Sequence, residues 1–341
     1  MTDGNECSGL AIRIHACLLG GAIGDALGAD IEFASLARIR DRFPRPPAAL
    51  PRHDGVVGAI TDDTQMTLFT AEGLIRAAVR YDGRGICHPP SVVHHALLRW
   101  LVTQDETPRI EVDRAGLVLD QRLHARRAPG NTCLAALRAA GAFGEPAQND
   151  SKGCGTIMRV APVAFVLPGR IRDLAIETSA LTHGHPTGQE AAAAWALILA
   201  ALADGGDLEE AANRQIGAFG SETDRAMTRA LEAPRDGAAE TAERLGGGWT
   251  AEEALSIALY AGLSARDFEH GLLIAVTHSG DSDSTGAIAG NALGLMFPDE
   301  VRSHRWAGQV ECADLIERVS HDLAAAMAGQ VGALGEDYPG F

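Results

Sequence analysis

Apolar and polar residues follow one another along most of the chain with the spacing of amphipathic helices. Near the end of the chain, Cys312, Leu315, Ile316, Val319 and Leu323 recur every three or four residues, so they lie on one helical face. Patterns of this kind, together with apolar stretches of helical length, predict helices over 8–29, 62–81, 90–103, 131–142, 172–182, 188–204, 207–218, 250–262, 266–277, 284–297 and 309–328.

Strand signals are few. The best is RVAPVAFVL at 159–167, which could also be helical, while the polar, glycine-rich stretch 219–249 suggests an excursion or a mobile loop. No Pro/Ser-rich or low-complexity linker interrupts the 341 residues. We therefore predict an all-α fold with a single domain over residues 1–341.

Two predicted helices carry rows of glycine at four-residue spacing. The first row lies in 8–29 and the second in 284–297, and their members are Gly20, Gly24, Gly28, Gly286, Gly290 and Gly294. Glycine within a helix costs about 1 kcal/mol relative to alanine, so such rows indicate that another backbone approaches closely. Both helices are therefore expected to be buried and tightly packed.

Two short clusters of oxygen-bearing side chains lie at predicted helix entrances. Carboxylates brought together repel one another, by roughly 4 kcal/mol per pair at 4 Å in a protein-like dielectric, unless a cation neutralises them. If the clusters converge, they bind metal. They consist of Thr61, Asp62 and Asp63, with Thr61 or Asp62 as helix cap, and of Asp281, Asp283 and Ser284, with Asp283 or Ser284 as cap.

The donor atoms of these clusters restrict the kind of cation. An EF-hand reading of the second cluster fails, because its twelfth position is Ala292 and not a bidentate glutamate. Oxygen ligands without cysteine or histidine favour Mg²⁺, Mn²⁺ or Ca²⁺ over Zn²⁺.

Composition argues against some binding partners and indicates the cellular compartment. A formal net charge of −16 argues against nonspecific binding to nucleic acid or to an anionic membrane. The six cysteines are scattered without a CxxC pair, so reduced thiols are expected. The N-terminus lacks the features of a signal peptide, and no apolar run is expected to span a bilayer. We expect a cytoplasmic protein with no membrane partner.

Three loops add candidate binding residues. In 128–133, Asn131 or Thr132 reads as the cap of the next helix. In 151–159, glycines would let backbone amides approach a phosphate, although no Walker motif is present. In 182–188 two histidines flank a turn, an arrangement that is more often structural than zinc-binding.

Five motifs, in order, resemble the ADP-ribosylglycohydrolases, the family that includes dinitrogenase reductase-activating glycohydrolase. They span about 25–294 and read GDALGADIE (24–32), TDDT (61–64), SKGCGTIMRVAPV (151–163), THGHP (182–186) and GDSDSTGAIAGNALG (280–294). The resemblance implies an all-α orthogonal helical bundle with a centre of two divalent cations, Mg²⁺ or Mn²⁺.

By this resemblance, the metal ligands are the six residues of the two acidic clusters, and the catalytic residues are Glu32, Asp62 and Asp283. Ser284 departs from the family pattern, which has threonine there, but it keeps the hydroxyl oxygen. Ser279 stands where many members have a second glycine. The role of Asp25 is left open.

The resemblance also implies where substrate binds. The diphosphate would lie against the 151–155 loop, in which Cys154 stands where several relatives have asparagine, so a contact through an asparagine side chain is not expected here. The substrate-binding candidates are Ser151, Lys152, Gly153, Cys154, Gly155, His183 and Asn131.

The implied reaction is hydrolysis of the N- or O-glycosidic bond at C1″ of ADP-ribose. Partners would be an ADP-ribosylated protein or a small ADP-ribose conjugate, bound by a monomer. Nucleic acid is disfavoured by charge, but ADP-ribosylated nucleic acid stays open. The alternatives are a noncatalytic ADP-ribose-binding or crystallin-like member and a two-metal nucleotide phosphohydrolase.

Overall fold

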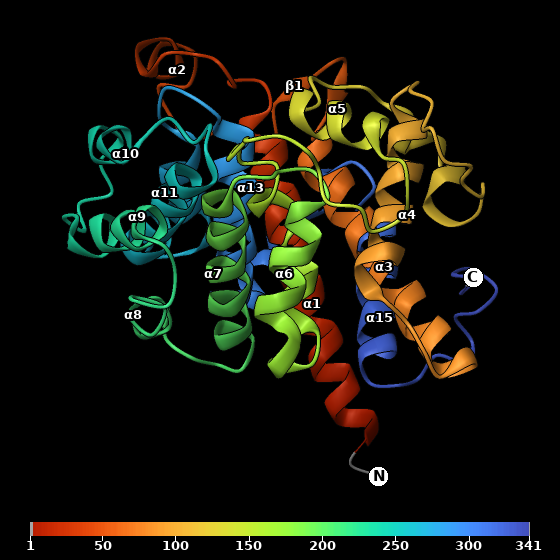
Figure 1. The fold of residues 1–341 in the computed structure, drawn as a ribbon. Coiled ribbons are helices and arrows are strands. Elements are labelled where there is room, and N and C mark those ends of the chain that lie inside the picture. The colour runs from red at the N-terminus through yellow and green to blue at the C-terminus, as the bar shows by residue number, and fades with distance from the viewer. Residues whose placement is uncertain (1–2, 341) are drawn as a thin grey trace.

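The structure is a computed structural model that describes residues 3–340. Within this range the regular secondary structure is helical apart from one isolated bridge and a two-stranded hairpin, in which Arg52 pairs with Val57 and His53 with Val56 (Figure 1). The elements are α1 (Asp3–Gly28), α2 (Leu36–Arg42), β1 (Arg52–His53), β2 (Val56–Val57), α3 (Asp62–Arg84), α4 (Pro89–Thr103), α5 (Asn131–Ala139), α6 (Ile171–Ala180), α7 (Pro186–Ala203), α8 (Leu208–Asn213), α9 (Ser221–Glu232), α10 (Ala239–Leu245), α11 (Ala251–Ser264), α12 (Phe268–Val276), α13 (Ser282–Met296), α14 (Pro298–Ser303) and α15 (Ala313–Met327), with short 3₁₀ helices between some of them. The fold is all-α, as the sequence predicts.

Helices α1 and α13 form the central pair of the molecule and pack along their lengths (Figure 1). Their glycine rows face each other. A Cβ added at Gly20, Gly24 or Gly28 would lie less than 3.0 Å from a backbone oxygen of α13, and one at Gly290 or Gly294 would meet α1 in the same way. The expectation of buried, tightly packed helices is confirmed, and each proves to be the other's partner.

Helix α3 lies between α4 and α15 and carries a buried ion cluster. The Glu72 carboxylate accepts from Arg76 Nε at 2.8 Å and pairs with Arg99 of α4 at 3.3 Å. All three side chains are almost completely buried, so removal of one would leave an uncompensated charge inside the fold. The cluster holds α4 against the middle of α3, the helix that begins with Asp62 and Asp63.

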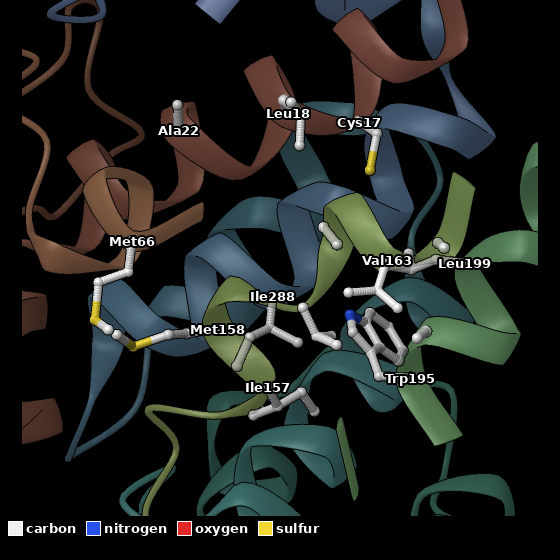
Figure 2. Packing of buried hydrophobic residues seen from close by; sticks show 14 of the residues in the cluster. Cys17, Leu18, Ala22, Met66, Ile157, Met158, Val163, Trp195, Leu199 and Ile288 are labelled. Atoms are coloured by element: carbon white, nitrogen blue, oxygen red, sulfur yellow. The ribbon is translucent and has the colours of Figure 1, made fainter. Parts of the chain in front are cut away.

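A continuous set of buried apolar residues, from Ala11 to Tyr338, fills the space between the helices. Figure 2 shows part of it, with Ile157, Val163, Trp195 and Ile288 among the side chains. Residues 159–165 belong to this interior as parts of two 3₁₀ helices, Ile157–Arg159 and Ala161–Phe165, whereas Leu167 is exposed, so the strand reading is wrong. Because Ala161–Phe165 is buried on all sides, its sequence shows no period that would separate the two structures.

The stretch 219–249 is also different from the prediction, because it contains α9 and α10. In α9 the buried positions are Thr223, Ala226, Met227 and Ala230, which recur at helical spacing, but all except Met227 are small or polar. Such residues give a weak apolar signal among many charges. The glycines at 246–248 do form a loop, which passes over the entrance of α13.

The sequence analysis expected no apolar run that could span a bilayer, and helix α1 is an exception by length and composition. Its segment Gly9–Gly28 is long and apolar enough, by length and composition, to cross a bilayer, although 78% of the tested window is buried inside the fold. Contact with α13 accounts for that apolar character. The described cysteines Cys17, Cys87, Cys133, Cys154 and Cys312 are free thiols, whereas the Cys7 side chain lies outside the described residues.

Candidate active site

The two predicted clusters lie at the end of the bundle where α1 ends and α3 and α13 begin, and Asp62 and Asp63 are close enough to Asp283 for its charge to raise their pKa values. Glu32, Asp281 and Asp283 each offer a carboxylate oxygen, and these atoms lie within 4.8 Å of one another. Glu32 is held in a turn after α1, since its N–H donates to Gly28 O at 3.0 Å. Glu32, a catalytic residue by the resemblance, thus lies beside two of the predicted metal ligands.

The turn that follows Glu32 is fixed to the entrance of α13. The N–H of Phe33 donates to Gly280 O at 3.1 Å, and the N–H of Leu36, the first residue of α2, donates to Ser279 Oγ at 2.8 Å. Ser279 in turn donates to Glu243 Oε1 at 2.5 Å. Ser279 therefore anchors α2 beside the acidic centre.

Asp25, whose role the sequence left open, organises the first cluster. It lies on α1 near Gly28, and its carboxylate accepts from Thr61 N at 3.0 Å, Thr61 Oγ1 at 2.8 Å, Thr64 N at 3.2 Å and Thr64 Oγ1 at 2.5 Å. A carboxylate at a helix N-terminus also interacts favourably with its free amides. Asp25 thus fixes the start of α3 against the end of α1.

The two aspartates that begin α3 differ in their hydrogen bonding. Asp62 Oδ2 accepts the N–H of Gly130, which immediately precedes α5, at 3.0 Å. Asp63 is only 3% exposed, and its Oδ1 has no hydrogen-bond partner among the described residues. Thr61 caps α3 by accepting the Asp63 N–H, so one of the two cap predictions is confirmed. A buried carboxylate oxygen without a partner fits a cation ligand.

Burial and mutual repulsion raise the pKa values of these carboxyl groups. Burial, and then the charge of Asp283, raises the pKa of Asp25 to about 7 and that of Glu32 to about 9. Burial also raises the pKa of Asp62 to about 7 and that of Asp63 well above its usual range. The donor set is therefore one that bound divalent cations would stabilise in its ionised form.

The second cluster differs from its prediction at the helix cap. Helix α13 begins at Ser282, its N-cap is Asp281, and no side chain caps it, so neither Asp283 nor Ser284 does so. Asp283 Oδ1 accepts the N–H of Ser284 at 3.0 Å. The Ser284 hydroxyl instead faces sulfur, with Oγ 3.6 Å from Cys154 Sγ.

The 151–155 loop passes close to the acidic centre. The thiol of Cys154 donates to Asp281 Oδ2 at 2.9 Å, and the backbone of Gly153 pairs with Thr250 in an isolated bridge. Ser151 Oγ lies 3.2 Å from Thr132 Oγ1 in the first turn of α5. The loop therefore borders both the second cluster and the N-terminus of α5.

The side chain of Lys152, a substrate-binding candidate, forms ion pairs that the sequence did not indicate. Its Nζ donates to Glu222 Oε2 at 2.8 Å and to Glu252 Oε1 at 2.5 Å, and the hydrogen bond with Glu222 is the main reason that its pKa is raised. These partners belong to α9 and α11. The ammonium group thus joins the loop to two helices.

The remaining candidates, Asn131 and His183, lie in contrasting surroundings. Asn131 is exposed as the first residue of α5, and no side chain caps this helix, so the cap expected from Asn131 or Thr132 is absent. His183 is only 1% exposed, and its Nδ1 lies 2.8 Å from Thr182 Oγ1. Burial lowers the His183 pKa to about 3, so the neutral ring packs behind the 151–155 loop, near Gly153 and Gly155.

Sequence reasoning missed an aromatic pair at this site. Phe33 and Trp249 stack with ring centroids 5.1 Å apart and planes 22° apart, and their exposed fractions are 67% and 42%. Trp249 O accepts the Cys154 N–H at 3.2 Å, which connects its loop to the thiol beside Asp281. A glutamate followed by an aromatic residue is the only local signal that could have pointed to Phe33.

Comparison with known proteins shows the family of this chain. A family model described as ADP-ribosylglycohydrolase matches residues 7–332, which is nearly the whole chain. The chain belongs to the ADP-ribosylglycohydrolase family. Both acidic clusters and all three candidate binding loops lie inside the matched residues.

Two individual proteins are similar over most of their length. An uncharacterized protein of Archaeoglobus fulgidus is 26% identical over 324 residues, which cover 91% of this chain and 95% of that protein. A solved structure described as an ADP-ribosylglycohydrolase-related protein complex superimposes with a TM-score of 0.66 at 24% identity, covering 94% of this chain and 99% of that one. The second likeness shows that the fold is that of the ADP-ribosylglycohydrolases.

Proposed function

We propose that this ADP-ribosylglycohydrolase family member is a metal-dependent hydrolase that cleaves the glycosidic bond between ADP-ribose and an acceptor, releasing ADP-ribose. The acceptor would be a protein side chain such as arginine or serine, or another ADP-ribosyl conjugate. The observation that carries the proposal is the convergence of Glu32, Asp281 and Asp283 beside Asp62 and Asp63, in a chain of this family.

The residues present fit a centre of two divalent cations, Mg²⁺ or Mn²⁺. The unpartnered Oδ1 of Asp63 and the raised pKa values of the neighbouring acids support this assignment. When bound, the cations would polarise the distal ribose and lower the pKa of a nearby water. The proposed ligands are Thr61, Asp62, Asp63, Asp281, Asp283 and Ser284.

The chain's own groups would then perform three tasks. Glu32, next to the reacting sugar, would transfer the proton, because it is the acid at the edge of the buried cluster. The negative charge of Asp62 and Asp283 would stabilise the oxocarbenium-like charge at C1″. The N–H groups of Ser151, Gly153 and Cys154 already donate within the protein, so the remaining amides of the 151–155 loop and those in the uncapped first turn of α5 would bind the diphosphate.

A substrate panel tests the proposal. ADP-ribosylated arginine peptide, serine peptide, DNA and the acetyl ester of ADP-ribose are incubated with the protein and Mg²⁺, Mn²⁺ or EDTA. We expect free ADP-ribose from at least one substrate, loss of that activity in EDTA, and loss of at least about 100-fold in Asp62→Ala and Asp283→Ala. Asp41→Ala, an exposed aspartate on α2, should match the parental rate.

Three other outcomes would contradict the proposal. Release of inorganic phosphate from a nucleotide would identify a two-metal phosphohydrolase. Binding of ADP-ribose in calorimetry, without turnover of any linkage, would identify a noncatalytic member. Parental activity of Asp283→Ala with metal present would show that the acidic centre does not perform the reaction.

A further inference from the structure

Cys154 places a sulfur atom among the proposed ligands of the cation centre. Its Sγ lies 2.9 Å from Asp281 Oδ2 and 3.6 Å from Ser284 Oγ. The three atoms come from two segments, the 151–155 loop and the entrance of α13. Sequence reasoning assigned Cys154 to the diphosphate and treated the metal ligands as oxygen only.

Each of these two separations fits ligation of a single ion by the sulfur together with the oxygen concerned. Ligand atoms bound at about 2.3 Å for sulfur and about 2.1 Å for oxygen, with ordinary tetrahedral to octahedral angles, lie roughly 3.1–3.6 Å apart. The two measured values are within a few tenths of an ångström of that range. Sγ could therefore enter the coordination sphere with little movement of the chain.

A second observation indicates that an ion belongs at this place. Asp63 is buried, its Oδ1 has no hydrogen-bond partner among the described residues, and it lies close enough to Asp281 and Cys154 to repel both electrostatically. Asp281 also belongs to the group of Glu32, Asp281 and Asp283 whose oxygens lie within 4.8 Å of one another. The thiol thus borders a built cluster of buried carboxylates.

We propose that one of the two cations is held by mixed oxygen and sulfur ligation, with the Cys154 thiolate as a ligand, and that this position prefers a borderline ion such as Zn²⁺ or Fe²⁺ to Mg²⁺. Thiolate ligands favour such ions, whereas carboxylates alone favour Mg²⁺ and Mn²⁺. As the metal–sulfur bond forms, the S–H proton leaves to solvent. The inference rests on the proposed cation centre but not on the ADP-ribose substrate.

The test uses Co²⁺ and Cd²⁺ as probes on the full-length, metal-stripped protein. A thiolate bound to either ion gives a ligand-to-metal charge-transfer band in the ultraviolet, which oxygen ligands do not give. We expect the band in the parental protein and its loss in Cys154→Ser. Calorimetry should show that Cys154→Ser weakens Zn²⁺ binding by about 10–100-fold and changes Mg²⁺ binding little.

Two matched variants locate the sulfur. Cys133→Ser, at a thiol beside Gly155, and Cys87→Ser, at a partly exposed thiol in the link between α3 and α4, should keep the band. Circular dichroism melting checks that each variant is folded. A band that persists in Cys154→Ser, or that is absent from parental protein shown by calorimetry to bind Co²⁺, would overturn the inference.

This result and the proposed function can fail separately. A protein that shows the Cys154-dependent band but hydrolyses no ADP-ribose conjugate would contradict the proposed reaction alone. A protein that hydrolyses a conjugate with Mg²⁺ and shows no band would contradict the sulfur ligation alone.

Discussion

The ring of Phe33 stacks on the ring of Trp249, and Phe33 is the residue that follows Glu32. Phe33 has φ 63°, a left-handed conformation that costs a non-glycine residue on the order of 1–3 kcal/mol. The stack contributes about 0.5–1.5 kcal/mol and helps to hold this turn. Trp249 thereby stabilises the position of the proposed proton-transfer group from 217 residues away.

The first prediction concerns this stack. Trp249→Ala should lower kcat/KM for the hydrolysed conjugate by about three- to tenfold, because the Glu32–Phe33 turn loses its support. Since neither ring belongs to the buried core, the melting temperature should change little. Steady-state kinetics and calorimetry measure the two effects.

A conservative replacement serves as the control. Trp249→Phe keeps an aromatic face against Phe33 and should retain most of the activity. Parental kcat/KM in Trp249→Ala would mean that the stack has no part in positioning Glu32.

The second prediction concerns the stability of the metal-free protein as pH changes. The folded-state pKa values of Asp25 and Asp62 are raised to about 7, and that of Glu32 to about 9. Above about pH 4 the folded state therefore binds more protons than the unfolded state, and stability falls as pH rises. In EDTA, the melting temperature should be higher at pH 5.5 than at pH 8.5.

Metal and a neutral variant should both change that dependence. Saturating Mn²⁺ should raise the melting temperature more at pH 8.5 than at pH 5.5, since cations and protons compete for the same oxygens. Asp283→Asn removes one repelling charge and should stabilise the metal-free protein at pH 8.5 by about 1–3 kcal/mol. Equal stability of metal-free parental protein at the two pH values would contradict the electrostatic account.

The third prediction concerns Asp25. Asp25→Asn replaces an acceptor oxygen with a donor that faces the N–H and hydroxyl groups of Thr61 and Thr64. The start of α3 should shift, and Mn²⁺ affinity measured by calorimetry should fall by about 10–100-fold. Thr64→Ser keeps the hydroxyl donor and should bind Mn²⁺ nearly as the parental protein does. Unchanged affinity in Asp25→Asn would show that Asp25 does not position the ligands.

The fourth prediction concerns the contact between α1 and α13. Gly24→Ala puts a methyl group into the backbone of Gly286, so the helices must separate, and we expect destabilisation of about 2–4 kcal/mol. Gly9→Ala lies in the same helix with open space around it and should be neutral or slightly stabilising. Urea unfolding measures both. Similar free energies of unfolding for the two variants would contradict close backbone packing.

Much of the fold can be predicted from the sequence, because its long helices are strongly patterned. The start of α3 can be predicted from its cap Thr61. The glycine rows predict close backbone packing of α1 and α13. Helices α9 and α10 were missed, since alanine and threonine cover much of their buried faces. Their packing depends on tertiary neighbours that no local pattern reveals.

The candidate site was predicted as a set of residues but not as a network. Both acidic clusters can be recognised in the sequence, because the residues of each are close together and are of types that occur at helix N-termini. The hydrogen bonds from Thr61 to Asp25 span 36 residues, and the contact of Cys154 with Asp281 spans 127. Such contacts exist only once the helices have packed, so a single sequence does not display them.

The glycine contact between α1 and α13 restricts how this chain can vary. In most cores a large side chain can grow where its neighbour shrinks, so paired changes preserve the packing. Gly20, Gly24, Gly286 and Gly290 face backbone atoms, which cannot shrink. No second substitution can rescue a first one there. A selection from a library randomised at these positions should therefore return glycine alone. Neighbouring positions whose contacts are made by side chains should accept several residue types.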